Sequence, residues 1–215
     1  MTFRGIIFDL DGTLIDSLED LADSMNGVLS QFRFPQHDLI AYKSFIGRGI
    51  RNLVKAALPE NRRNEETLDK CYKLMLEIYA ENCIDKTKPY PGILELLDEL
   101  KSRHLKLAVL SNKADALTKK IVPSLLPGYF DEVMGLILEA NRKPNPAGAW
   151  DICKKWSLAP KEIIYVGDSN VDMQTAQNAG MFGVGVLWGY RDGQELMANG
   201  AELVIRQPLE LLSIL

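Results

Sequence analysis

Short apolar runs recur along the chain and alternate with segments whose apolar residues follow a helical spacing. The run from Arg4 to Phe8 is rich in isoleucine and bounded by turn residues, which predicts a buried strand. The same pattern predicts further strands at residues 106–110, 163–166 and 184–188, and weaker ones at 131–134 and 203–205. Helices are predicted between them at residues 93–101, 113–126 and 147–156. Alternating strands and helices predict an α/β, Rossmann-like core, whose parallel sheet is covered by helices on both faces.

A long helical stretch interrupts this alternation after the first strand. Residues 17–85 show helix signals and no convincing strand, and Ser17–Asp20 resembles a capping box that opens a helix. The proline-rich sequence KPYPG at 88–92 suits a hinge. We therefore predict an α/β core domain formed by residues 1–15 and 88–215, and a helical cap domain formed by residues 16–87.

Composition narrows the class of protein. The 215 residues are 47% apolar and 25% charged, with a net charge of −4, so nucleic acid and anionic membranes are not expected as partners. No apolar run reaches the roughly 20 residues of a membrane span, and acidic residues interrupt the short N-terminal one. Three cysteines far apart, Cys71, Cys83 and Cys153, predict buried free thiols and a reducing, cytoplasmic location.

The first strand leads into two acidic residues, Asp9 and Asp11. Side chains at i and i+2 of an extended chain point to the same side, and Gly12 allows the chain to turn away sharply. Open α/β sheets bind ligands at this end of their strands. Two close carboxylates repel each other, and a hard divalent ion such as Mg²⁺ would relieve that repulsion. The alternative is a turn with two solvated aspartates.

Other strand ends carry polar residues too. The strand at 106–110 ends in Ser111 and Asn112, a junction suited to anion binding. The strand at 163–166 precedes Asp168 and Asp172, and Lys143 precedes a proline that would start a helix. Taken singly, these residues can be helix caps or a surface lysine. Their joint placement at one edge of the sheet predicts a single site.

Four segments then resemble the motifs of the haloacid dehalogenase superfamily, in the subgroup with a helical cap. They are FDLDGTLIDS, LSNK, RKPNP and VGDSNVDMQTAQNAG. Within the superfamily the chain is most similar to phosphoglycolate phosphatases, through FIGRGIRNLV and LWGYRDGQELMANGAELVI. The resemblance covers essentially the whole chain.

This resemblance implies hydrolysis of a phosphate monoester through an aspartyl-phosphate. Asp9 would attack phosphorus, and Asp11 would protonate the leaving group and later deprotonate water. Mg²⁺ would bind Asp9, the backbone carbonyl of Asp11 and Asp168, with Asp172 orienting the site or binding through water.

The remaining roles concern the substrate, a small phosphorylated metabolite. Ser111, the Asn112 backbone and Lys143 would hold the phosphoryl oxygens. Thr13 is expected to contact the substrate, and Arg48 to bind its far end, for instance the carboxylate of phosphoglycolate. The segment Trp188–Arg191 either lines the rim of the site or is structural.

Several alternatives stay open at this point. The same scaffold serves pyrophosphatases, nucleotidases, sugar phosphatases and sugar-phosphate mutases, and the acid Asp11 does not exclude a mutase. A signalling receiver domain also phosphorylates an aspartate, but it is half this length and carries the acceptor on its third strand. A non-catalytic relative is a further alternative. The expected assembly is a monomer or a homodimer.

Overall fold

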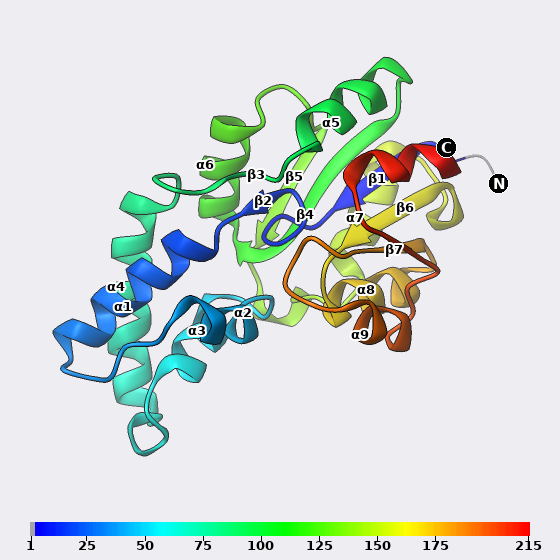
Figure 1. Ribbon diagram of the computed structural model, residues 1–215. Coiled ribbons are helices and arrows are strands. Elements are labelled where there is room, and N and C mark those ends of the chain that lie inside the picture. The colour runs from blue at the N-terminus through cyan, green and yellow to red at the C-terminus, as the bar shows by residue number, and fades with distance from the viewer. Residues whose placement is uncertain (1–2) are drawn as a thin grey trace. The chain divides into compact units, whose positions relative to one another are not determined.

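A computed structural model of the protein describes residues 3–215. The chain forms two compact units: Met1–Asp16 together with Pro89–Leu215, here called the core unit, and Ser17–Lys88, here called the helical unit. Figure 1 shows the ribbon of both. A two-stranded sheet of β2 (Ile15–Asp16) and β3 (Lys88–Pro89) lies where the chain passes from one unit to the other.

The core unit is built on a six-stranded sheet in the order β5-β4-β1-β6-β7-β8. Every pairing recorded between neighbouring strands is parallel, which confirms the predicted α/β fold with a helical insertion after the first strand. The strands are β1 (Gly5–Phe8), β4 (Lys106–Ala114), β5 (Glu132–Leu136), β6 (Ile163–Gly167), β7 (Phe182–Val186) and β8 (Leu203–Ile205).

Both faces of the central strand are buried. Ile7 packs with Ala108 and Tyr165 of the neighbouring strands in one cluster, which also contains Ala149 and Ala176 from two helices. Its neighbours in sequence, Ile6 and Phe8, point to the opposite face and are buried as well. Two covered faces explain the unbroken apolar runs from which the strands were predicted.

Helices connect the strands of the core unit. They are α5 (Ile93–Ser102), α6 (Asp115–Leu125), α7 (Ala147–Trp156), α8 (Asn170–Ala179) and α9 (Gly193–Ala198), with the 3₁₀ turns η2 (Glu139–Asn141), η3 (Pro160–Glu162) and η4 (Pro208–Ile214).

Several predicted boundaries were displaced, most clearly those of β4 and β7. The strand β4 continues to Ala114, through a register irregularity against β5, so α6 begins at Asp115 instead of Lys113. The strand β7 begins at Phe182 instead of Val184, because Phe182 and Gly183 already pair with β6. Glycine is a weak strand signal, and this explains why the sequence pattern began two residues late.

The helical unit contains α1 (Leu18–Gln31), α2 (Leu39–Phe45), α3 (Ile50–Ala57), η1 (Glu60–Arg62) and α4 (Glu65–Asn82). The helix signals of residues 17–85 correspond to buried apolar faces, which in α3 and α4 consist of Ile50, Leu53, Val54, Ala57, Leu68, Cys71, Met75 and Tyr79. The capping box predicted at Ser17 was wrong, since the Ser17 side chain makes no capping hydrogen bond. The Asp20 carboxylate instead accepts hydrogen bonds from the backbone N–H groups of Lys86 and Thr87.

The cysteines are free and buried, as predicted. Within residues 3–215, no helix is both long and apolar enough to cross a bilayer.

Candidate active site

Residues far apart in the sequence meet at the carboxyl edge of the sheet. Asp9 follows β1, Ser111 and Asn112 lie in the last part of β4, and Asp168 follows β6. Parallel neighbouring strands bring these positions together, because β1 pairs with both β4 and β6. Asp172, in the first turn of α8, completes the set of acids. The predicted convergence of strand ends is therefore present in the core unit.

Lys143 lies at the centre of this group. Its Nζ is 2.7 Å from Oδ1 of Asp9 and 2.6 Å from Oδ1 of Asp172, and it donates to the Leu110 carbonyl at 3.1 Å. The lysine side chain is only 3% exposed. A surface lysine, one of the alternatives at this position, is excluded by that burial.

Asn112 holds Lys143 in place through its side chain. Its Oδ1 accepts from the Lys143 backbone N–H at 2.8 Å, and its Nδ2 donates to the Lys143 carbonyl at 3.2 Å. Both ends of the amide are used, so the side chain of Asn112 has a positioning role. The backbone of Asn112, the part expected to meet a phosphate, is not involved in these two bonds.

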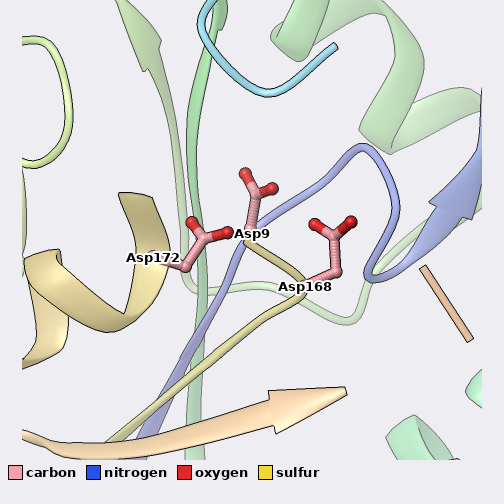
Figure 2. A group of neighbouring side chains, drawn as sticks. All are labelled: Asp9, Asp168 and Asp172. Carbon is pink, nitrogen blue, oxygen red and sulfur yellow. The ribbon is translucent and has the colours of Figure 1, made fainter. Parts of the chain in front are cut away.

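Near the lysine are three buried carboxylates, those of Asp9, Asp168 and Asp172, which Figure 2 shows together. One oxygen from each of Asp9, Asp168 and Asp172 lies within 4.8 Å of the others. Asp172 is fixed at the N-terminus of α8 by Ser169, whose Oγ donates to Oδ2 of Asp172 at 2.5 Å and whose backbone N–H donates at 3.1 Å. The carboxylate of Asp11 does not belong to this group of three.

Crowding and burial perturb these groups. Burial, reinforced by the charge of Asp172, raises the pKa of Asp9, although Lys143 opposes the rise. Burial also raises the pKa of Asp168 well above its ordinary value, with further contributions from Asp172 and Asp9. Burial alone would lower the pKa of Lys143, but the carboxylates of Asp172 and Asp9 outweigh it and raise that pKa. Negative charge thus exceeds positive charge in the cluster, which a divalent cation would balance.

Asp11 pairs with a second lysine that sequence reasoning missed. Nζ of Lys113 is 2.9 Å from Oδ1 of Asp11, and the lysine side chain is 2% exposed. Lys113 stands two residues after Ser111 in the same strand, and its backbone N–H donates to Oγ of Ser111 at 3.1 Å. The position of Lys113, two residues after Ser111, was the available signal. It could not reveal that the partner of Lys113 is Asp11, which lies 102 positions earlier in the sequence.

Thr13 and Arg48 are placed differently from the other predicted residues. Thr13 is fully buried, and its hydroxyl has no hydrogen-bond partner within the described part of the chain. Arg48 is exposed and belongs to the helical unit, between α2 and α3. The contacts of both residues with a substrate stay predictions.

Comparisons with known proteins show what the chain is similar to. Residues 6–186 match the family model described as haloacid dehalogenase-like hydrolase. The phosphoglycolate phosphatase of Aquifex aeolicus is 33% identical over 213 residues, covering 99% of this chain and 96% of that protein. That of Chromobacterium violaceum is 31% identical over 216 residues, again covering 99% and 96%.

A solved structure has the same fold. The crystal structure of a protein from Haemophilus somnus, described as a predicted phosphoglycolate phosphatase, superposes with a TM-score of 0.92 at 30% identity. The match covers 100% of this chain and 98% of that one.

Proposed function

Because the chain belongs to the haloacid dehalogenase-like hydrolases, we propose that it is a Mg²⁺-dependent phosphatase that attacks phosphate monoesters with the carboxylate of Asp9. The observation that carries the proposal is the contact of Lys143 with both Asp9 and Asp172 at the carboxyl edge of the sheet. A buried carboxylate beside a buried ammonium is an oriented nucleophile next to a group that attracts phosphoryl oxygens.

The acidic cluster fits a hard divalent cation. Three carboxylate oxygens lie within 4.8 Å of one another, and the Lys143 ammonium pairs with two of these carboxylates, Asp9 and Asp172. Asp9, Asp168 and the backbone carbonyl of Asp11 would hold Mg²⁺, with Asp172 orienting the site. When bound, the cation would neutralise charge between the nucleophile and the phosphoryl oxygens.

The chain's own side chains account for the reaction in two steps. In the first step a carboxylate oxygen of Asp9 forms a bond to phosphorus, the ester P–O bond breaks, and the leaving oxygen takes a proton from Asp11. In the second step water attacks phosphorus while Asp11 takes a proton from it, and the bond between phosphorus and Asp9 breaks. Inorganic phosphate leaves and both carboxyl groups return to their starting states.

Ser111 and Lys143 are suited to hold the transferred group. Both are at most 4% exposed and lie at the same edge as Asp9. The ammonium of Lys143 is held by Asp9, Asp172 and the Leu110 carbonyl, so it needs little reorganisation to meet developing charge. The backbone N–H of Asn112 would add a third donor.

Phosphoglycolate is the substrate that we propose. The relatives from Aquifex aeolicus and Chromobacterium violaceum carry that name and align over nearly the whole chain. The glycolate carboxylate needs a cationic partner, and Arg48 in the helical unit is our candidate.

A panel of phosphorylated metabolites tests this function. We expect release of inorganic phosphate from phosphoglycolate with the highest kcat/KM, no turnover in EDTA, and no turnover by the Asp9→Asn variant. If a nucleotide, a sugar phosphate or pyrophosphate had the highest kcat/KM, phosphoglycolate would be the wrong substrate, but hydrolysis through Asp9 would still stand. Conversion of glucose 1-phosphate into an isomeric glucose phosphate, without release of inorganic phosphate, would show that the protein is a mutase and not a phosphatase.

Arg48 is tested separately with a matched arginine. Arg48→Ala should lower kcat/KM for phosphoglycolate at least tenfold. It should leave kcat/KM for p-nitrophenyl phosphate, an ester that has no carboxylate, within threefold of the wild-type value. Arg62, exposed in η1, provides the control, and Arg62→Ala should leave kcat/KM for both esters unchanged. Equal effects of Arg48→Ala on both esters would contradict the carboxylate role.

A further inference from the structure

The segment Trp188–Tyr190, just after β7, bonds to two of the loops that carry the candidate site. The backbone N–H of Tyr190 donates to Oδ2 of Asp168 at 2.8 Å. The indole Nε1–H of Trp188 donates to the carbonyl of Thr13 at 2.9 Å. One short segment therefore connects the loop after β6 with the loop after β1, which lies 175 residues away from Trp188.

No space for a side chain exists between these loops. A Cβ on Gly189 would lie 2.3 Å from Cβ of Asp168 and 2.4 Å from the carbonyl oxygen of Gly12. A Cβ on Gly12 would lie 2.4 Å from Oδ2 of Asp168. Gly12 also has a φ of +86°, which favours glycine, whereas at Gly189 the restriction comes from space. Gly12 and Gly189 thus lie directly against the side chain of Asp168, and Gly189 also lies against the backbone of Gly12.

We propose that Trp188–Tyr190 is a positioning segment, which holds the Asp168 carboxylate and the loop 11–13 in the arrangement that binds the divalent cation. This inference rests on the proposed function. Groups that hydrogen-bond to metal ligands orient them, and their loss typically weakens metal binding by about 10–100-fold. The bond to Asp168 comes from a backbone N–H, so replacing the Tyr190 side chain would leave it in place. The sensitive position is Gly189, where any side chain would push the segment away from Asp168.

Two glycine variants of the full chain test the proposal. Gly189→Ala should weaken Mn²⁺ binding, measured by electron paramagnetic resonance of the free ion, by about 10–100-fold. Gly193→Ala is the matched control, because its Cβ would lie 3.4 Å from Leu187, an ordinary contact. The control should bind Mn²⁺ within twofold of the wild type. Thermal melts in EDTA show whether both variants fold. A folded Gly189→Ala variant with wild-type Mn²⁺ affinity would overturn the proposal.

A second pair keeps the proposal testable if Gly189→Ala does not fold. Trp188→Phe retains an aromatic ring and removes the bond to Thr13, and it should lower kcat/KM for p-nitrophenyl phosphate by about 3–10-fold, the worth of one hydrogen bond. Trp150→Phe is the control, since Trp150 also donates to a backbone carbonyl, that of Ala179 at 3.3 Å, outside the candidate site. Equal kcat/KM values for the two tryptophan variants would overturn the proposal.

The same measurements separate this inference from the proposed function. A wild-type protein that neither binds Mn²⁺ nor hydrolyses p-nitrophenyl phosphate would reject the function itself. A wild-type protein that does both, together with a folded Gly189→Ala variant that matches it, would reject the positioning role alone.

Discussion

Asp20 in the helical unit and Asp9 in the core unit are both buried carboxylates, 3% and 7% exposed, but their surroundings differ. Asp20 accepts hydrogen bonds from the backbone N–H groups of Lys86 and Thr87, and from the Thr87 hydroxyl at 2.6 Å. Asp9 pairs with Lys143 and faces the carboxylates of Asp168 and Asp172. The first acid is surrounded by donors and the second by further acids.

The difference distinguishes structural from functional burial of charge. The donors around Asp20 join the start of α1 to the end of the helical unit, which is a structural role. At Asp9, burial and the neighbouring charge of Asp172 raise the pKa of the carboxyl group, so the core site is arranged at a cost to stability that a bound cation would relieve. Substitutions in the two clusters should therefore have opposite consequences.

The largest expected effect is on turnover by Asp9→Asn. Loss of the attacking carboxylate should lower kcat for p-nitrophenyl phosphate by about 10³-fold or more, since the covalent route disappears. Asparagine can still accept from Lys143 and removes one crowded charge, so the free energy of unfolding in EDTA should not fall. A kcat of Asp9→Asn above one tenth of the wild-type value would contradict the role of Asp9 as nucleophile. Asp9 would then no longer serve as the functional acid in the comparison with Asp20.

Asp20→Asn should show the reverse. Its amide would place donors against the donors of Lys86 and Thr87, and we expect a loss of about 2–4 kcal/mol in the free energy of unfolding from urea titrations. Asp23→Asn is the matched control on the same helix: Asp23 binds the Lys86 ammonium at an exposed position, and its loss should cost less than about 1 kcal/mol. Equal losses in the free energy of unfolding for the two variants would show that the burial of Asp20 does not determine its contribution to stability.

Mg²⁺ should stabilise the wild type against urea. A concentration one hundred times the dissociation constant would add about 2.7 kcal/mol over the value in EDTA. Asp168→Asn should lose most of this gain and Asp20→Asn should keep it, because only Asp168 lies in the acidic cluster. An equal gain in both variants would place the cation elsewhere.

The smallest expected effect concerns a second polar contact of the helical unit. The buried Tyr42 donates its hydroxyl to Asn26 at 2.8 Å, and Tyr42→Phe should cost about 1 kcal/mol without changing kcat. Tyr129→Phe removes an exposed bond to Asp98 and should cost less. A change in kcat for Tyr42→Phe would show that the polar contacts of the helical unit are not purely structural.

Much of the core was predictable because parallel strands have a simple geometry. Apolar runs identify strands buried on both faces, and residues at the carboxyl ends of neighbouring strands must come close. This is why Asp9, Ser111 and Asp168 could be grouped from the sequence, and why the helical insertion could be recognised by the absence of strands from residues 17–85. The strand limits at Ala114 and Phe182 depended on pairing and were missed.

The sequence by itself determined which chemical groups are present and at which edge of the sheet they emerge. Only the tertiary structure decided their partners: Lys113 with Asp11, the Asn112 side chain with the Lys143 backbone, and the Tyr190 N–H with Asp168. The physical reason is one of range. Apolar periodicity records which face of an element is buried, whereas a hydrogen bond depends on distances within a few tenths of an ångström between segments that only folding brings together.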